Sequence, residues 1–207
     1  MAGKAVMGFG LAAGMLPLAL ALVPEASPAV APLPTLEEVA EQATVTLHPS
    51  RGAGAVVADD WHGATVAHCV RGERVQVELH DGRILGAKVA FRDEAKDHLL
   101  LELDVPARVR PLPIAEAPPA PGDRLFFGSR PERPMPAQEV EVTRMARCPS
   151  LPGVDRAIFT TLDARPGDSG SPLLDSDGAL AGMVHGGARC RISTPAAGLE
   201  LLLAPPG

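Results

Sequence analysis

Apolar and polar residues alternate over short stretches along much of the chain, a pattern that indicates half-buried β-strands. The stretch RVQVELH shows it most clearly, and the Asp81-Gly82 pair that follows is typical of a hairpin turn. Six strands are predicted before residue 111: Ala43–His48, Ala53–Ala58, Gly63–Val70, Arg74–Leu79, Arg83–Arg92 and His98–Val105. Six more are predicted after residue 122: Arg124–Gly128, Glu139–Arg147, Ala157–Leu162, Ser171–Leu174, Leu180–His185 and a last one near Gly198–Leu203.

A proline-rich segment, PLPIAEAPPAPG, separates the two groups of strands. Prolines fix φ and lack a backbone donor, so residues 111–122 are predicted as an extended linker. This divides the body of the chain into a first lobe at 43–110 and a second lobe at 123–207. Short strands with frequent turns favour a sandwich or a barrel, and a barrel has no open sheet edge. A short helix is predicted at Leu36–Glu41.

The beginning of the chain has a different composition. Lys4 precedes an apolar run from Ala5 to Val23, and small residues and prolines follow. These features are typical of a signal peptide, here residues 1–29 with cleavage after Ala29, followed by a linker at 30–42. The run is also long enough to remain as a membrane anchor. Both interpretations predict an exported protein, and only the second attaches it to a membrane.

Charge and cysteine content exclude several classes of function. The net charge is −6 and no run of lysine or arginine occurs, which argues against a nucleic-acid-binding protein and against an anionic membrane surface as partner. The three cysteines, Cys69, Cys148 and Cys190, form no CxxC pair, so a zinc site has little support and no metal is predicted.

Three residues with catalytic chemistry stand in a specific order. Ser169 lies in PGDSGSP, where the flanking glycines allow the tight backbone that aims N–H groups at an oxyanion. His68 ends a predicted strand, and Asp97 directly precedes an apolar strand. Taken singly, they could be a surface turn, a core histidine and a solvated carboxylate. Together they offer a nucleophile, a base and a carboxylate that orients the base.

The order His, Asp, Ser and the surrounding motifs resemble the chymotrypsin-like serine proteases, in particular the compact bacterial and periplasmic trypsin-like group. TVAHC is similar to the motif around the family's histidine, and RPGDSGSPLL to the motif around its serine. GMVHGG resembles the strand that pairs with substrate, and CRISTPA the stretch that lines the specificity pocket. The α/β-hydrolase elbow does not match, because Ser171 stands where that motif requires glycine.

The resemblance implies an all-β fold of two six-stranded Greek-key β-barrels, with the active site in the cleft between them. It implies a triad of His68, Asp97 and Ser169, and an oxyanion hole made by the backbone N–H groups of Gly167 and Ser169. The expected activity is cleavage of polypeptides through an acyl-enzyme, by a monomer that needs no metal or cofactor. The alternative is a catalytically latent protein that uses the same fold for binding or regulation.

The resemblance is weaker at the substrate-binding positions. Asp163, six residues before Ser169, would lie at the pocket floor and favour Arg or Lys. His185 instead suggests an acidic substrate residue, and Ala196 would narrow the pocket for a small or apolar one. Gly187 would lie on the strand that pairs with substrate. Within the same resemblance, Cys69 lacks its usual partner and is expected to be a free buried thiol, while Cys148 and Cys190 are expected to form a disulfide.

Overall fold

The computed structural model describes residues 34–128, 138–186 and 191–203, together with Met1 and Gly3. It divides the chain into two units, Met1–Pro32 and Leu33–Gly207. The expected signal peptide falls in the first unit and, apart from Met1 and Gly3, lies outside the described residues. Within the described parts of the chain no helix is long and apolar enough to cross a membrane.

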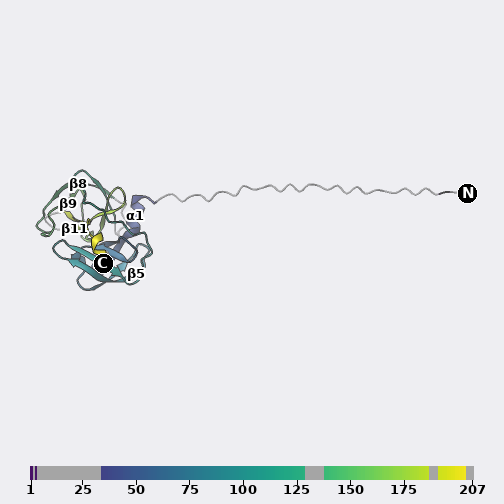
Figure 1. Ribbon diagram of the computed structural model, residues 1–207, viewed down its shortest axis with the longest axis horizontal. Coiled ribbons are helices and arrows are strands. Elements are labelled where there is room, and N and C mark those ends of the chain that lie inside the picture. The colour runs from purple at the N-terminus through teal and green to yellow at the C-terminus, as the bar shows by residue number, and fades with distance from the viewer. Residues whose placement is uncertain (2, 4–33, 129–137, 187–190, 204–207) are drawn as a thin grey trace. The chain divides into compact units, whose positions relative to one another are not determined.

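The first six strands close into an antiparallel barrel in the order β1-β2-β3-β6-β5-β4 (Figure 1). Its core is formed by inward-facing aliphatic residues, and leucines 99, 100 and 101 of β6 are all almost fully buried. The strands are β1 (Thr44–His48), β2 (Ala53–Val56), β3 (His62–Thr65), β4 (Arg74–Glu78), β5 (Ile84–Asp93) and β6 (His98–Leu103).

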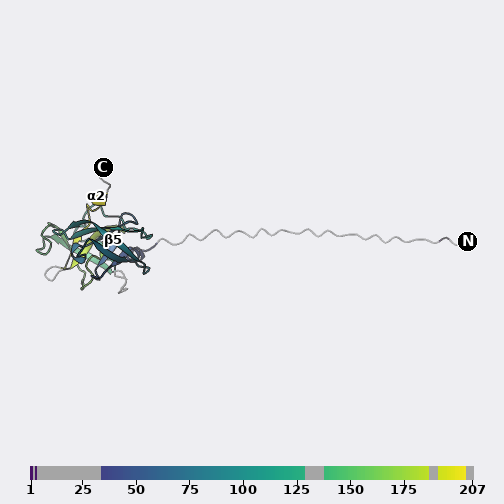
Figure 2. The ribbon, with the colours of Figure 1, turned by 90° about the horizontal axis from the view of Figure 1, so that it is seen from below.

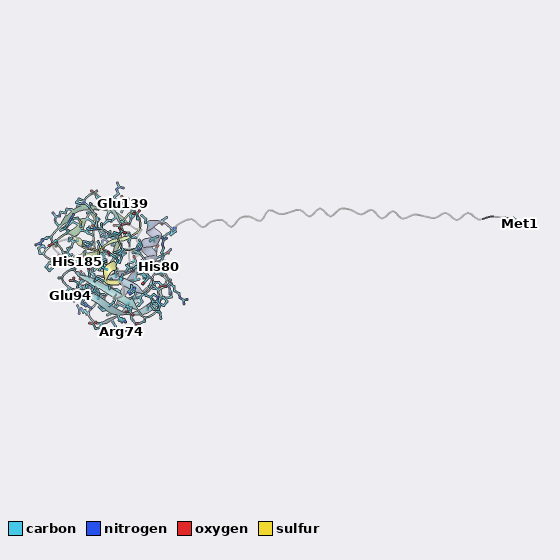
Figure 3. All side chains as sticks on the ribbon, viewed as in Figure 1. Met1, Arg74, His80, Glu94, Glu139 and His185 are labelled. Atoms are coloured by element: carbon cyan, nitrogen blue, oxygen red, sulfur yellow. The ribbon has the colours of Figure 1, made fainter. Side chains whose placement is uncertain are left out.

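The second six strands close into another antiparallel barrel in the order β10-β11-β12-β9-β8-β7. The expected all-β fold of two six-stranded barrels is therefore confirmed. The strands are β7 (Arg124–Phe127), β8 (Gln138–Ala146), β9 (Ala157–Thr160), β10 (Pro172–Leu174), β11 (Leu180–Gly186) and β12 (Ile192–Pro195). Arg74 of the first barrel and Glu139 of the second lie at opposite outer ends, with His185 between them (Figure 3).

The last predicted strand is wrong. The final strand is β12, and the segment Gly198–Leu203 instead contains a short helix, α2 (Glu200–Leu203). The apolar run Leu201–Leu203 is too short for its periodicity to separate a strand from a helical turn. The strand is set by tertiary pairing, since β12 lies between β11 and β9.

A helix at the start of the second unit, α1 (Leu36–Ala43), covers the predicted helix Leu36–Glu41 and continues for two more residues. It begins with a capping box, in which Thr35 Oγ1 accepts the Glu38 N–H and the Thr35 N–H donates to Glu38 Oε2. Its buried face carries Ala40 and Ala43 and belongs to the same apolar core as the first barrel.

The predicted linker makes contact with both barrels. Leu112 forms a parallel bridge with Val57 of the first lobe, and Ile114 forms one with Leu180 of the second. The two barrels also share a core, because Leu174 and Met183 pack in one cluster with the first barrel's leucines. The C-terminal helix α2 lies at the edge of this joint body (Figure 2).

Candidate active site

The register between β3 and β6 brings His68 and Asp97 together. Thr65 at the end of β3 pairs with Leu99 near the start of β6, so the residues just outside these ends face one another. His68 lies in a 3₁₀ turn, Ala67–Cys69, rather than at the end of a strand as predicted. The turn is held to Asp97 by its backbone, since the Ala67 N–H donates to the Asp97 carbonyl at 3.2 Å.

Asp97 is buried, with its side chain 6% exposed, and each of its carboxylate oxygens accepts a hydrogen bond from His68. Oδ1 accepts the His68 backbone N–H at 3.0 Å, and Oδ2 lies 2.8 Å from His68 Nδ1. Burial alone would raise the pKa of Asp97, but the hydrogen bonds from His185 and His68 together lower it below its usual range. Asp97 is therefore an ionised carboxylate in the interior.

His68 is more open than its partner, with a side chain that is 44% exposed. Its hydrogen bond to Asp97 raises the pKa of the imidazole above its ordinary value of 6.5, and the nearby Cys69 thiol acts in the same direction, against the effect of burial. Because Nδ1 donates to the carboxylate, Nε2 is the nitrogen left to accept a proton. This is the tautomer that a general base requires.

Ser169 comes from the loop between β9 and β10, and this loop is fixed to both barrels. The Ala53 N–H of β2 donates to the Ser169 carbonyl at 2.7 Å, and the Gly170 N–H donates to the Val184 carbonyl of β11 at 2.7 Å. Inside the loop, Asp168 Oδ2 accepts the Arg165 N–H at 2.6 Å. Asp168 thus braces the loop through the backbone of Arg165.

The nucleophile points toward β11. Ser169 Oγ donates to the backbone carbonyl of His185 at 3.3 Å, rather than to His68. Hydrogen bonds of this kind are often long or misaligned before substrate binds, so a rotation of the serine side chain is the step that would engage the base. Gly167 has φ +94°, and neither its N–H nor that of Ser169 donates within the described residues. Both donors remain available for an oxyanion.

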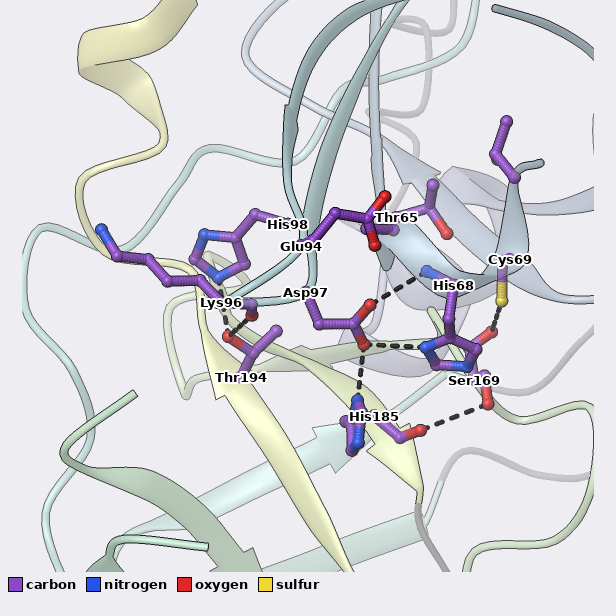
Figure 4. Close-up of polar contacts among 12 residues, drawn as sticks. Thr65, His68, Cys69, Glu94, Lys96, Asp97, His98, Ser169, His185 and Thr194 are labelled. Carbon is purple, nitrogen blue, oxygen red and sulfur yellow. Dashed lines mark hydrogen bonds and ion pairs between the residues drawn. The ribbon is translucent and has the colours of Figure 1, made fainter. Parts of the chain in front are cut away.

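A second histidine binds the same carboxylate. His185 Nδ1 lies 2.5 Å from Asp97 Oδ2, and its side chain is only 13% exposed (Figure 4). Its ring meets that of His68 edge-on, with the centroids 5.3 Å apart. The sequence pointed to His185 as a substrate contact and gave no signal for this role, because residues 97 and 185 come from different barrels.

His68, Asp97 and His185 also offer ligand atoms that all lie within 4.8 Å of one another, as a metal site would require. A tetrahedral zinc ion would hold its nitrogen and oxygen ligands about 3.3 Å apart. The nitrogen–oxygen distances of 2.5 and 2.8 Å are instead typical of hydrogen bonds between the histidines and the carboxylate. The cluster fits a hydrogen-bonded group better than a metal centre.

A cleft of about 650 Å³ opens beside the nucleophile and provides room for a substrate chain. Cys69, which is free and buried as expected, lies at its wall and points its thiol at the Ser169 carbonyl, 3.7 Å away. The predicted oxyanion residues face the same space. Its lining includes His48, Gly52, His68, Cys69, Gly167 and Ser169.

The other substrate-binding candidates are not gathered in this way. Asp163 is exposed and forms an ion pair with Arg191 at 2.5 Å, so it does not present an unpaired charge at a buried pocket floor. Ala196 is fully buried. Gly187 and Cys190 lie outside the described residues, so the expected disulfide stays a prediction. Cys148 is buried, with its sulfur 3.0 Å from Ser150 Oγ.

Comparison with known proteins agrees with this geometry. A family model described as "Trypsin-like peptidase domain" matches residues 52–183, well over half of the chain. The chain belongs to the trypsin-like peptidase family. The matched range contains all three residues of the predicted triad and the loop that holds the nucleophile.

Individual proteins are also similar to this trypsin-like peptidase. It is 31% identical over 140 residues to Protease Do-like 1, chloroplastic, of Arabidopsis thaliana, a match that covers 64% of this chain and 32% of that protein. The chain thus spans about a third of the length of this curated relative. Two solved structures share its fold. The inactive form of Rv3671c protease, a protein of M. tuberculosis H37Rv, has a TM-score of 0.63 with 23% identity over 80% of this chain and 88% of the other. The structure of Deg5 has a TM-score of 0.64 with 21% identity, and the match covers 81% of this chain and 88% of that one.

Proposed function

We propose that this protein is a serine endopeptidase in which Ser169, His68 and Asp97 act as the triad. The observation that carries the proposal is the bond between His68 Nδ1 and the buried Asp97 carboxylate, 2.8 Å long, beside a serine held in a braced loop. A carboxylate in this position fixes the imidazole tautomer and stabilises its charged form.

The chemistry follows from these positions. His68 Nε2 removes the proton of Ser169 Oγ as the oxygen attacks the scissile carbonyl carbon, and it then gives that proton to the leaving amine. The N–H groups of Gly167 and Ser169 stabilise the oxyanion, a contribution of about 2.7–4 kcal/mol for one such donor in a comparable site. Water then hydrolyses the acyl-enzyme by the same proton transfers.

A fluorophosphonate probe tests this proposal, because it reacts only with an activated serine. We expect the wild type to be labelled and Ser169→Ala to remain unlabelled. Ser171→Ala is the matched control: its buried hydroxyl has no hydrogen-bond partner among the described residues, so its removal should leave both fold and labelling intact. A folded wild-type protein that the probe does not label would contradict the proposal.

One observation favours the alternative of a latent protein with a binding role, namely the bond from Ser169 Oγ to the His185 carbonyl instead of to His68. Labelling that appears only after a peptide ligand is added would support that alternative. Labelling without any ligand would exclude it.

We also propose a preference for a small or apolar residue before the scissile bond. Asp163 is already paired with Arg191, and the His185 ring is bonded to Asp97, so neither offers a charge to substrate. Cleavage of a peptide library should then be richest after small aliphatic residues. Dominant cleavage after Arg, Lys or Glu would contradict this.

We further propose export, with removal of residues 1–29, and action as a monomer. The charged start and apolar run at the N-terminus support export. Mass spectrometry of the protein from its native host should give an N-terminus near Val30, and light scattering should give the monomer mass. An intact N-terminus in a membrane fraction would indicate an anchor instead.

The disulfide between Cys148 and Cys190 is likewise proposed. Alkylation of the unreduced, denatured protein should modify one thiol, that of Cys69. Three modified cysteines would exclude the disulfide.

A further inference from the structure

His185 contacts every member of the proposed triad. Its Nδ1 lies 2.5 Å from Asp97 Oδ2, and its backbone carbonyl accepts the Ser169 hydroxyl at 3.3 Å. Its ring packs edge-on against that of His68, with an interplanar angle of 84°. These contacts link β11 of the second barrel to the Asp97 loop of the first.

The contact with Asp97 is made in the interior. The side chains of Asp97 and His185 are 6% and 13% exposed, so water has little access to replace a lost donor. A buried carboxylate stays ionised only when hydrogen bonds compensate for its desolvation. His185 supplies one donor to Oδ2, and the side chain and backbone of His68 supply the others.

The position of the ring does not fit a substrate contact. The described side chains that line the cleft beside Ser169 include His68 but not His185. With Nδ1 committed to Asp97, this nitrogen of His185 is not available to bind a substrate.

We propose that His185 is a positioning residue of the triad, which holds the Asp97 carboxylate ionised and aimed at His68 while its carbonyl fixes the resting position of Ser169. This inference rests on the proposed endopeptidase function. His185 takes no proton from the substrate and acts only through Asp97 and Ser169. Its loss should therefore affect turnover and leave substrate affinity largely unchanged.

Two substitutions separate the hydrogen bond from simple packing. His185→Leu fills a similar volume and excludes water but has no donor. His185→Asn places an amide N–H close to the position of Nδ1. We expect kcat to fall about 10- to 100-fold in the leucine variant, the loss expected for a hydrogen bond to a charged group, with KM unchanged. The asparagine variant should recover most of the activity.

The pH profile gives a second readout. In His185→Leu, Asp97 Oδ2 has lost a donor and holds the proton of His68 more tightly. The acidic limb of kcat/KM should therefore move to higher pH in this variant and stay in place in His185→Asn. His62→Ala is the matched control, since His62 makes a similar bond of 2.7 Å to Asp59 at the surface, and it should behave as wild type.

Other outcomes would overturn the inference. Equal losses in both variants with an unmoved limb would leave His185 a packing residue, and a change in KM alone would make it a substrate contact. A proton NMR experiment on Ser169→Ala separates this inference from the proposed function. The imidazole N–H of His185, bonded to Asp97, should give one of the downfield signals, and His185→Leu should remove that signal. An unchanged set of downfield signals after that substitution would contradict the inference whether or not the protein cleaves peptides.

Discussion

Asp97 stands at φ +56°, in the left-handed region of backbone space, directly before β6. Few residues with a side chain adopt this conformation, and asparagine and aspartate do so most readily. The twist turns the carboxylate back toward the 3₁₀ turn that carries His68. The backbone conformation and the side chain of Asp97 therefore both serve to hold the carboxylate toward His68.

Asp97→Asn should fold normally and lose nearly all activity. Asparagine tolerates the left-handed backbone and fills the same space, but it carries no charge to stabilise the His68 imidazolium. In a comparable triad this change lowers kcat by about 10⁴-fold. Steady-state peptide cleavage and thermal unfolding measure the two effects. A variant that keeps a tenth of the activity would show that Asp97 is not the orienting carboxylate.

The raised pKa of His68 fixes the direction of the pH dependence. His68 accepts a proton only when it is neutral, so activity should rise with pH through the pKa of this group. The acidic limb of kcat/KM is expected above 6.5, the ordinary pKa of histidine. Asp97→Asn should move this limb downward, because the charge that raises the pKa has gone. A wild-type limb below 6.5 would contradict the assigned pairing.

Residue identity and order along the chain were enough to single out His68, Asp97 and Ser169 as candidates, because motifs around a nucleophile and a base are local in sequence. The second histidine bonded to Asp97, His185, was not predictable in this way. His185 meets Asp97 only because β11 of one barrel ends beside the loop before β6 of the other. The pairing of Asp163 with Arg191 is also non-local in sequence, although both residues belong to the second barrel, where β12 pairs with β9.

At the scale of elements, the loop between β9 and β10 is shaped by close backbone contact with β2. Gly170 has φ +86°, and a Cβ at this position would lie 1.9 Å from the Ala53 carbonyl oxygen. That oxygen also accepts the Thr65 hydroxyl at 2.6 Å. The nucleophile loop and the first barrel therefore fit together only with glycine at this position.

Gly170→Ala should destabilise the protein and remove fluorophosphonate labelling. Strain of the left-handed backbone and steric overlap together should lower the free energy of unfolding by about 3 kcal/mol or more. Gly82→Ala is the matched control, since φ is +83° and a Cβ there would meet nothing within 4 Å. It should lose only about 1–2 kcal/mol and keep labelling. Chemical denaturation measures both; equal losses would refute the close contact.

Most strands were predictable because each has a pattern of its own, as β4 shows with alternating burial in RVQVE. The C-terminal elements were not. In β12 the sequence ISTP has three buried residues, two of them polar, and its strand conformation depends on β9 and β11. The apolar residues of ELLL favoured a strand more strongly than ISTP did. They nevertheless form a largely exposed helical turn, with Leu201 76% exposed.

At the scale of the whole molecule, the site exists only where the barrels meet. The first barrel supplies His68 and Asp97, and the second supplies Ser169 and His185. The linker adds backbone bonds to each barrel, from the Leu112 N–H to the Val56 carbonyl at 2.9 Å and from the Leu180 N–H to the Pro113 carbonyl at 2.7 Å. Neither barrel can open without breaking contacts of the other.

We therefore expect the two barrels to unfold in one cooperative step. Trp61, the sole tryptophan, lies in the first barrel between β2 and β3, so its fluorescence reports that barrel alone. Far-UV circular dichroism reports both barrels, and fluorophosphonate labelling reports the site between them. The three signals should share one midpoint on heating, because a two-state transition leaves no intermediate. Loss of labelling well before the tryptophan transition would instead mean that the second barrel detaches or melts first, and that the shared core does not bind the halves into one folding unit.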